Sequence, residues 1–160
     1  MANCEPKALT ALVADADREY LSLLASLLQE AGCTPICFER GQPALAALRQ
    51  RSFDILVMAA RMPDVDGLTI CAAARTWHGD HPVIVLLSTR NHRNDRVMGL
   101  DRGADDCIDK PVDPDELRAR IEAKIRRVFG RTRPQEPYPA RNQGAAPGGL
   151  RLVQVNRGTG

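Results

Sequence analysis

Short apolar runs alternate with amphipathic segments along the first 129 residues of the chain. The apolar runs predict five strands, at Leu9–Ala14, Thr34–Phe38, Asp54–Ala59, Val83–Leu87 and Asp105–Ile108. Apolar positions at a spacing of three or four residues predict five helices, at residues 17–32, Gly41–Arg51, Gly67–Trp77, Asn91–Arg102, and from Asp113 or Pro114 to Phe129. This alternation is typical of a doubly wound α/β fold with a parallel sheet.

The composition changes after residue 129. Residues 130–149 contain four prolines and several glycines but almost no large apolar side chain, which predicts a linker without a core of its own. Residues Leu150–Val155 then alternate apolar and polar side chains, as a half-buried strand does. We therefore expect one domain at residues 1–129, a linker at 130–149, and at 150–160 the start of a following domain that the chain does not contain.

The composition excludes several classes of protein. The 160 residues are 44% hydrophobic and 26% charged, as in globular proteins, and no apolar run approaches the roughly 18 residues of a membrane helix. No signal-peptide pattern opens the chain, so we expect a cytoplasmic protein without a membrane partner. The five cysteines lack a CxxC pair and are predicted to be reduced and mostly buried. The net charge of +2 is too small to indicate nucleic-acid binding by this segment.

Candidate functional residues follow the predicted strands. They are Asp15 and Ala16 after the first strand, Ala59 at the end of the third, Ser88 after the fourth, and Lys110 after the fifth. The carboxyl ends of parallel strands meet at one edge of the sheet, where the ligand crevice of such folds lies. Asp54 is predicted at the opposite end of its strand, and the histidines lack the spacing of metal ligands. No catalytic constellation is visible, so we expect no enzyme, no metal and no cofactor.

Three motifs in this chain resemble those of the bacterial response-regulator receiver domain. They are Met62-Pro63 followed by Gly67 after an apolar run, then Ser88-Thr89, then Lys110-Pro111, in this order. The resemblance covers residues 9–129 and implies the flavodoxin-like strand order 2-1-3-4-5. It also implies a phosphate-accepting aspartate at the position of Ala59, a metal-binding acid at Ala16, and an aromatic switch residue at Cys107.

Those three positions depart from the family pattern. A methyl group cannot accept a phosphoryl group, and two missing carboxylates leave too few oxygen ligands for Mg²⁺. We interpret Asp15, Ala16, Ala59, Ser88 and Lys110 as a degenerate phosphorylation pocket, with Cys107 at the switch position. Engineered alanines at 16 and 59 stay an open alternative, although the change at Cys107 favours natural degeneracy. Lys110 is predicted to contact Asp15, or Ser88 and water, because a buried ammonium is costly unless paired.

The fourth helix, fifth strand and fifth helix carry a charge pattern that resembles the dimerisation face of winged-helix (OmpR-like) response regulators. The resemblance implies pairs across a two-fold interface: Arg96 with Glu116, Asp105 with Arg120, and Asp106 with Arg127, beside the apolar Val97 and Leu100. Exposed ion pairs contribute only about 0–1 kcal/mol each, so they set register more than affinity. The simpler alternative is a solvated charged face.

These observations predict the receiver domain of a transcriptional regulator that forms a homodimer without aspartyl phosphorylation. Its contact with DNA would come through a domain absent from this chain. The alternative is a stand-alone protein-interaction or sensing module, with a small-molecule effector bound in the vacated pocket. A helix-turn-helix pattern after residue 160 would favour the first function.

Overall fold

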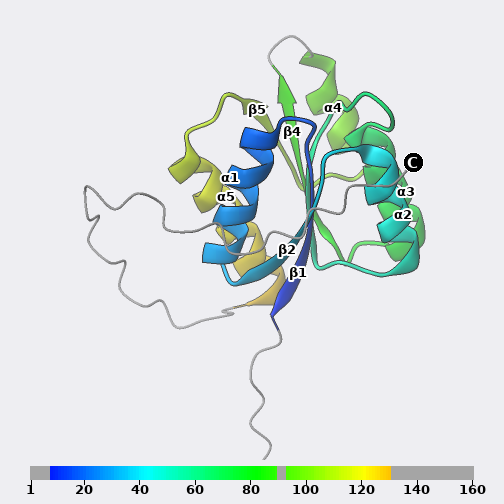
Figure 1. Cartoon of the computed structure of the whole chain (residues 1–160). Coiled ribbons are helices and arrows are strands. Elements are labelled where there is room, and N and C mark those ends of the chain that lie inside the picture. Colours follow the sequence, from blue (N-terminus) through cyan, green and yellow to red (C-terminus); the bar gives the residue numbers. More distant parts are fainter. Residues whose placement is uncertain (1–7, 90–92, 131–160) are drawn as a thin grey trace, which may run out of the picture.

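The computed structural model describes residues 8–89 and 93–130 of the chain. Within them, strands and helices alternate (Figure 1): β1 (Leu9–Ala14), α1 (Arg18–Glu30), β2 (Cys33–Phe38), α2 (Gly41–Gln50), β3 (Ile55–Ala59), α3 (Gly67–His78), β4 (Val83–Thr89), α4 (Arg93–Asp101), β5 (Asp106–Lys110) and α5 (Pro114–Phe129). The strands form a parallel sheet in the order β2-β1-β3-β4-β5. The predicted fold class and strand order are confirmed. The predicted linker and following strand lie outside the described residues.

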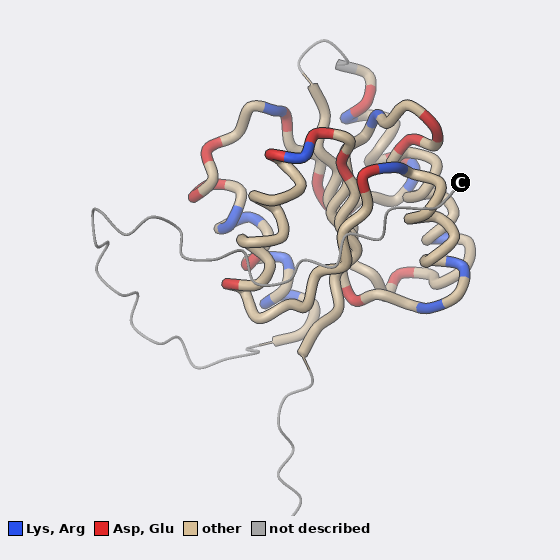
Figure 2. The backbone as a smooth tube through the Cα atoms, viewed as in Figure 1, with Lys and Arg blue, Asp and Glu red and all other residues tan. Residues whose placement is uncertain are grey.

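The sheet separates two apolar clusters, and successive side chains of each strand point into different clusters. On β3, Leu56 and Met58 belong to one cluster, whereas Ile55 and Val57 belong to the other. Helices α2, α3 and α4 cover the first face, and α1 and α5 cover the second (Figure 1). A strand buried on both faces must be apolar throughout. Charged residues accordingly lie mostly in the loops and on the helices that cover the sheet (Figure 2).

Three helices begin at an aspartate whose side chain accepts hydrogen bonds from the first turn. Asp17 caps α1, Asp66 caps α3 and Asp113 caps α5. Each satisfies backbone N–H groups that have no partner inside the helix. The start of α3 also approaches the end of β3 closely, because a Cβ added at Gly67 would overlap the carbonyl oxygen of Ala59. The caps therefore fix where the loops at this edge of the sheet begin and end.

The two strands at this side of the sheet extend further than the sequence predicts. β4 continues to Thr89, and β5 runs over Asp106–Lys110 instead of 105–108. The reason is pairing between the two strands, in which Ser88 lies opposite Asp109 and Thr89 lies opposite Lys110. Lys110 is consequently a residue of the sheet and not of the following loop. Its peptide bond to Pro111 is cis.

The described cysteines are Cys33, Cys37, Cys71 and Cys107, and all four are buried and free. Burial raises the pKa of Cys37 and Cys71 to about 11. Burial, together with the nearby charge of Asp54, also raises the pKa of Cys33 to about 11. The prediction of reduced, buried cysteines is confirmed for these four residues. No helix in the described part of the chain has the length and apolarity needed to span a membrane.

Candidate functional site

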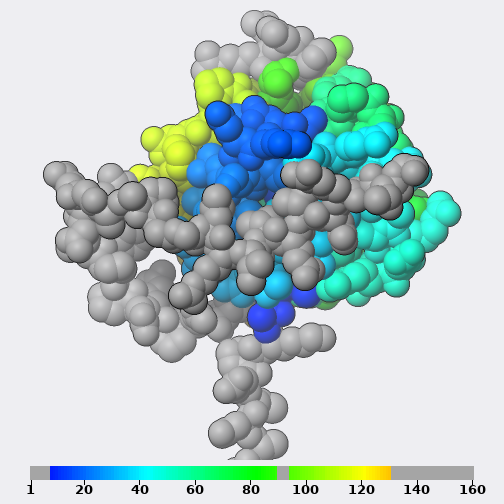
Figure 3. Space-filling model, in the orientation of Figure 1, coloured from blue at the N-terminus to red at the C-terminus, as the bar shows by residue number. Residues whose placement is uncertain are grey.

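The pocket residues predicted from the sequence meet at the carboxyl edge of the sheet. Ala59 ends β3, and the backbone N–H of the next residue, Ala60, donates to the carbonyl of Leu87 on β4 at 2.7 Å. Ser88 lies near the end of β4, and Lys110 ends β5. Asp15 follows β1 directly. In Figure 3 the blue surface at the start of α1 lies between the yellow surface around the start of α5 and the cyan and green of α2 and α3.

The centre of this edge is an ion pair between Lys110 and Asp15. Lys110 Nζ donates to Asp15 Oδ2 at 2.6 Å, and both side chains are largely buried. The other oxygen, Oδ1, accepts from the backbone N–H of Asp17 at 2.9 Å. The ring of Tyr20 lies 4.2 Å from the same ammonium. The predicted contact between Lys110 and Asp15 is therefore present, and both charges have partners within the chain.

The residues at this edge do not fit a magnesium ion. Ala16 and Ala59 present methyl groups where the family would supply carboxylates, and both oxygens of Asp15 are already engaged. Mg²⁺ prefers carboxylate and phosphate oxygens and keeps several waters. Among residues 8–89 and 93–130, no group of three or more His, Cys, Asp and Glu side chains is arranged to hold a metal. Within the described residues, the side chains at this edge therefore do not form the set of oxygen ligands that Mg²⁺ prefers.

A carboxylate that the sequence did not single out lies beside Ser88. The Ser88 hydroxyl donates to Asp109 Oδ1 at 2.6 Å, across the paired ends of β4 and β5. The only signal in the sequence is the position of Asp109 directly before Lys110. Cys107 lies two residues earlier on the same face of β5 and is buried, which raises the pKa of its thiol. No buried side-chain nitrogen or oxygen of the described residues lacks a hydrogen-bond partner. The buried polar side chains described at this edge therefore all have hydrogen-bond partners within the chain.

The predicted dimerisation face is exposed on α4, β5 and α5. Val97 is 61% exposed and Leu100 is 50% exposed, although both are apolar. Arg96 Nη2 donates to the carbonyl of Cys107 at 3.3 Å, which ties α4 to β5. On α5, Arg120 lies 3.0 Å from Glu116 and 3.7 Å from Asp106. These residues thus share one continuous surface.

Asp105 differs from the other charged residues of this face. Its Oδ2 accepts from the backbone N–H of Ile84 at 2.8 Å and from Arg75 Nη2 at 3.0 Å. It therefore helps to fix the start of β5 against β4 and α3 within one chain. Arg127 is exposed near the end of α5. All three pairs across an interface stay predictions: Arg96 with Glu116, Asp105 with Arg120, and Asp106 with Arg127.

Comparison with known proteins identifies the family to which a protein with this fold and site is similar. A family model described as the response regulator receiver domain matches residues 11–122. The transcriptional regulatory protein CpxR of Escherichia coli is 40% identical over 116 residues, which are 72% of this chain and 49% of that protein. The transcriptional regulatory protein TcrA of Mycobacterium tuberculosis is 38% identical over 116 residues, or 72% of this chain and 46% of that protein. The chain spans about half the length of these curated relatives.

A solved structure agrees with the fold. The receiver domain of the Francisella response regulator 1452 is 26% identical and superposes with a TM-score of 0.66. The match covers 74% of this chain and 98% of that domain. The family model, over residues 11–122, lies within residues 9–129, which carry the resemblance in the sequence.

Proposed function

The chain belongs to the response regulator receiver domain family, and we propose that it is the regulatory domain of an OmpR-like transcriptional regulator that dimerises without aspartyl phosphorylation. The curated relatives support this function, because CpxR and TcrA are named as transcriptional regulatory proteins. DNA contact would come from a domain that follows the linker. The protein would act in the bacterial cytoplasm, as a regulator and not as an enzyme.

The observation that carries the proposal is Ala59 at the end of β3. The family aspartate at this position is the nucleophile, and a methyl group has no lone pair with which to attack a phosphorus atom. The carboxylate that remains after β1 is neutralised within the chain, since Lys110 pairs with Asp15 at 2.6 Å. A cluster of carboxylates repels itself and attracts a divalent cation, whereas a neutral pair does neither. The pocket therefore lacks both the phosphoryl-accepting aspartate and the cluster of carboxylates that would attract the metal ion.

The exposed apolar residues of α4 support the proposed dimerisation. Val97 and Leu100 leave a hydrophobic strip in water, and charged side chains of α4 and α5 border it. A two-fold axis through such a face would bring Arg96 of one copy to Glu116 of the other, twice per dimer. The apolar strip would supply affinity, and the charges would set register and partner. In a phosphorylated receiver the modification shifts an equilibrium towards the dimer, whereas here the bias is built in.

The test treats the wild-type chain with acetyl phosphate, and separately with beryllofluoride, in the presence of Mg²⁺. We expect an unchanged intact mass and, by sedimentation equilibrium, a dimer at micromolar concentration with or without these reagents. A stable adduct would overturn the claim of phosphorylation independence. A chain that stays monomeric at high micromolar concentration would overturn the dimer and favour the stand-alone interaction or sensing module.

A further inference from the structure

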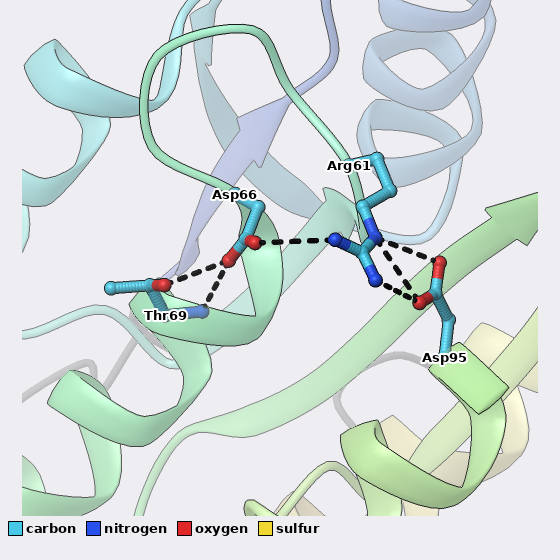
Figure 4. A network of polar contacts seen from close by, with 4 residues as sticks. All are labelled: Arg61, Asp66, Thr69 and Asp95. Carbon is cyan, nitrogen blue, oxygen red and sulfur yellow. Dashed lines mark hydrogen bonds and ion pairs between the residues drawn. The ribbon is translucent and has the colours of Figure 1, made fainter. Parts of the chain in front are cut away.

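The loop after β3 carries an arginine that reaches across to α4. Arg61 is two residues beyond Ala59, and its guanidinium donates hydrogen bonds to the carboxylate of Asp95 in the first turn of α4 (Figure 4). Nε donates to Oδ1 at 3.1 Å and to Oδ2 at 3.2 Å, and Nη2 donates to Oδ1 at 2.8 Å. These residues are 34 positions apart in the sequence. The pair therefore joins the end of β3 directly to α4.

The two partners differ in their contact with water. Asp95 is completely buried, whereas about half of the Arg61 side chain is exposed. The arginine thus lies over the carboxylate and covers it. A buried carboxylate without a partner is strongly unfavourable, so α4 can keep Asp95 inside only while a cation contacts it. The hydrogen bonds that Arg61 donates to Asp95 in turn raise the pKa of Arg61 above its usual value, so this cation stays charged.

Arg61 is itself held by the start of α3. Its Nη1 lies 3.9 Å from Asp66 Oδ2, and Asp66 accepts from the backbone N–H and the hydroxyl of Thr69, both at 2.8 Å (Figure 4). Asp66 is the N-cap of α3 and therefore has little freedom to move. The guanidinium therefore contacts the starts of two helices. Asp66, at the start of α3, limits the position of Arg61, and Arg61 in turn holds Asp95 at the start of α4.

The inner face of α4 depends on this anchor. Asp95 and Gly99 are four residues apart and lie on the same side of the helix, and both are buried. At Gly99 the helix lies so close to β4 that an added Cβ would be 2.8 Å from Leu86 Cδ1. Val97 and Leu100 follow Asp95 by two and five residues, which places them about 200° and 140° around the helix. They therefore point away from the sheet when Asp95 points into it.

We propose that Arg61 is a positioning residue that, through Asp95, sets the rotation and depth of α4 and so presents Val97 and Leu100 to the partner copy. The inference rests on the proposed dimer and deepens it, since it names the internal contact that replaces an external trigger. A further described polar contact between α4 and the body of the domain is that of Arg96 Nη2 with the carbonyl of Cys107 at 3.3 Å. Loss of the Arg61 contact would therefore act on α4 before it acts on the rest of the fold.

The experiment compares Arg61→Met, Arg61→Lys and Asp95→Asn with the wild-type chain. Two quantities are measured: hydrogen exchange of the α4 amides relative to those of α1, and the dissociation constant of the dimer by sedimentation equilibrium. We expect Arg61→Met to accelerate exchange in α4 but not in α1, and to weaken the dimer about tenfold, the size expected for a charged hydrogen bond. Arg61→Lys should be intermediate, because an ammonium keeps the charge but lacks the two-pronged contact.

A double variant separates positioning from mere stability. Arg61→Met/Asp95→Asn removes the unpaired charge, so its resistance to urea should recover, while the dimer should stay weak because nothing ties α4 down. Arg40→Met is the matched control, since Arg40 is an exposed arginine 3.7 Å from Asp64 with no described contact to α4. It should leave both measured quantities unchanged.

Three results would count against the inference. Wild-type exchange rates in α4 of whichever Arg61 variants fold would overturn it, as would acceleration spread equally over α1 and α4. Recovery of the dimer together with stability in the double variant would also overturn it, because the role of Arg61 would then be structural only. A monomeric wild-type chain would instead overturn the proposed function, and the exchange of α4 would still decide whether Arg61 positions this helix.

Discussion

Lys110 Nζ lies 2.6 Å from Asp15 Oδ2, so the cation directly before the cis-proline of this domain is neutralised within the chain. The two residues are 95 positions apart: Lys110 ends β5, and Asp15 directly follows β1. In a pocket with a phosphoaspartate the lysine would have a second anion to contact. Here Ala59 supplies none, and the pair itself becomes part of the fold.

Removing the lysine should destabilise the domain. In Lys110→Met the carboxylate of Asp15 stays buried without its cation, and the free energy of unfolding should fall by about 3 kcal/mol. Urea denaturation measures the change. The double variant Lys110→Met/Asp15→Asn should recover most of it, because no unpaired charge remains. Lys124→Met on α5 is the control and should lie within about 0.5 kcal/mol of the wild type. Equal stability of Lys110→Met and the wild type would show that the pair contributes nothing.

Restoring the missing carboxylates should restore phosphoryl uptake. The variant Ala16→Asp/Ala59→Asp returns the nucleophile and a metal ligand to an edge that already holds Ser88 and Lys110. Incubated with acetyl phosphate and Mg²⁺, it should gain the mass of one phosphoryl group, and hydroxylamine should remove it. The isosteric Ala16→Asn/Ala59→Asn is the control and should gain nothing. Failure of the aspartate variant, when folded, would mean that the edge has diverged further than these two positions.

Reversing single charges on the α4 and α5 face should weaken the dimer, and mixing two variants should rescue it. Arg96→Glu and Glu116→Arg each place like charges opposite one another in a symmetric dimer. A mixture of the two chains forms a heterodimer in which both pairs are again opposite in sign. Sedimentation of the separate and mixed chains measures this. We avoid Asp105, because it is already bound to Arg75 and Ile84 within the chain.

That prediction has a clear contrary result. A mixture that dimerises no better than either variant alone would place the interface elsewhere. Arg18→Glu is a suitable control, since Arg18 begins α1, pairs with Glu39 at 2.9 Å, and is not one of the residues of the proposed dimerisation face. It should leave the dissociation constant unchanged.

Asp64 should make stability depend on pH in the acid range. Desolvation alone would raise its pKa, but hydrogen bonds from the backbone of Gln42 and Gly41 lower the pKa to about 2. The folded state therefore favours the ionised carboxylate, and its contribution is present above the ordinary pKa of 3.8 and is lost as pH falls towards 2. Asp64→Asn should cost about 1 kcal/mol near pH 7, the size of a helix-cap contact.

The difference between Asp64→Asn and the wild type should shrink as pH falls from about 4 to about 2.5. Urea denaturation over this range measures it. The exposed Asp80 offers a control, since Asp80→Asn should differ little from the wild type at every pH. A difference for Asp64→Asn that is constant with pH would mean that the carboxylate charge plays no part in holding the start of α2.

The sequence by itself determined the order of the elements and showed an alanine at position 59, where the receiver family has an aspartate. Strands buried on both faces must be continuously apolar, and surface helices must repeat their apolar positions every three or four residues, so both patterns are visible along the chain. The capping aspartates Asp17, Asp66 and Asp113 mark helix starts because their contacts span only two or three residues. Ala59 could be located because it has a fixed distance to Met62-Pro63.

Only the tertiary structure decided which distant charges meet. Arg61 and Asp95, Ser88 and Asp109, and Arg75 and Asp105 are brought together by the pairing of strands and the packing of helices. No periodicity relates such partners, because their separations of 34, 21 and 30 residues depend on the lengths of whole elements and loops. The end of β5 was mispredicted for the same reason. Asp109 and Lys110 are polar, and only their pairing with β4 makes them strand residues.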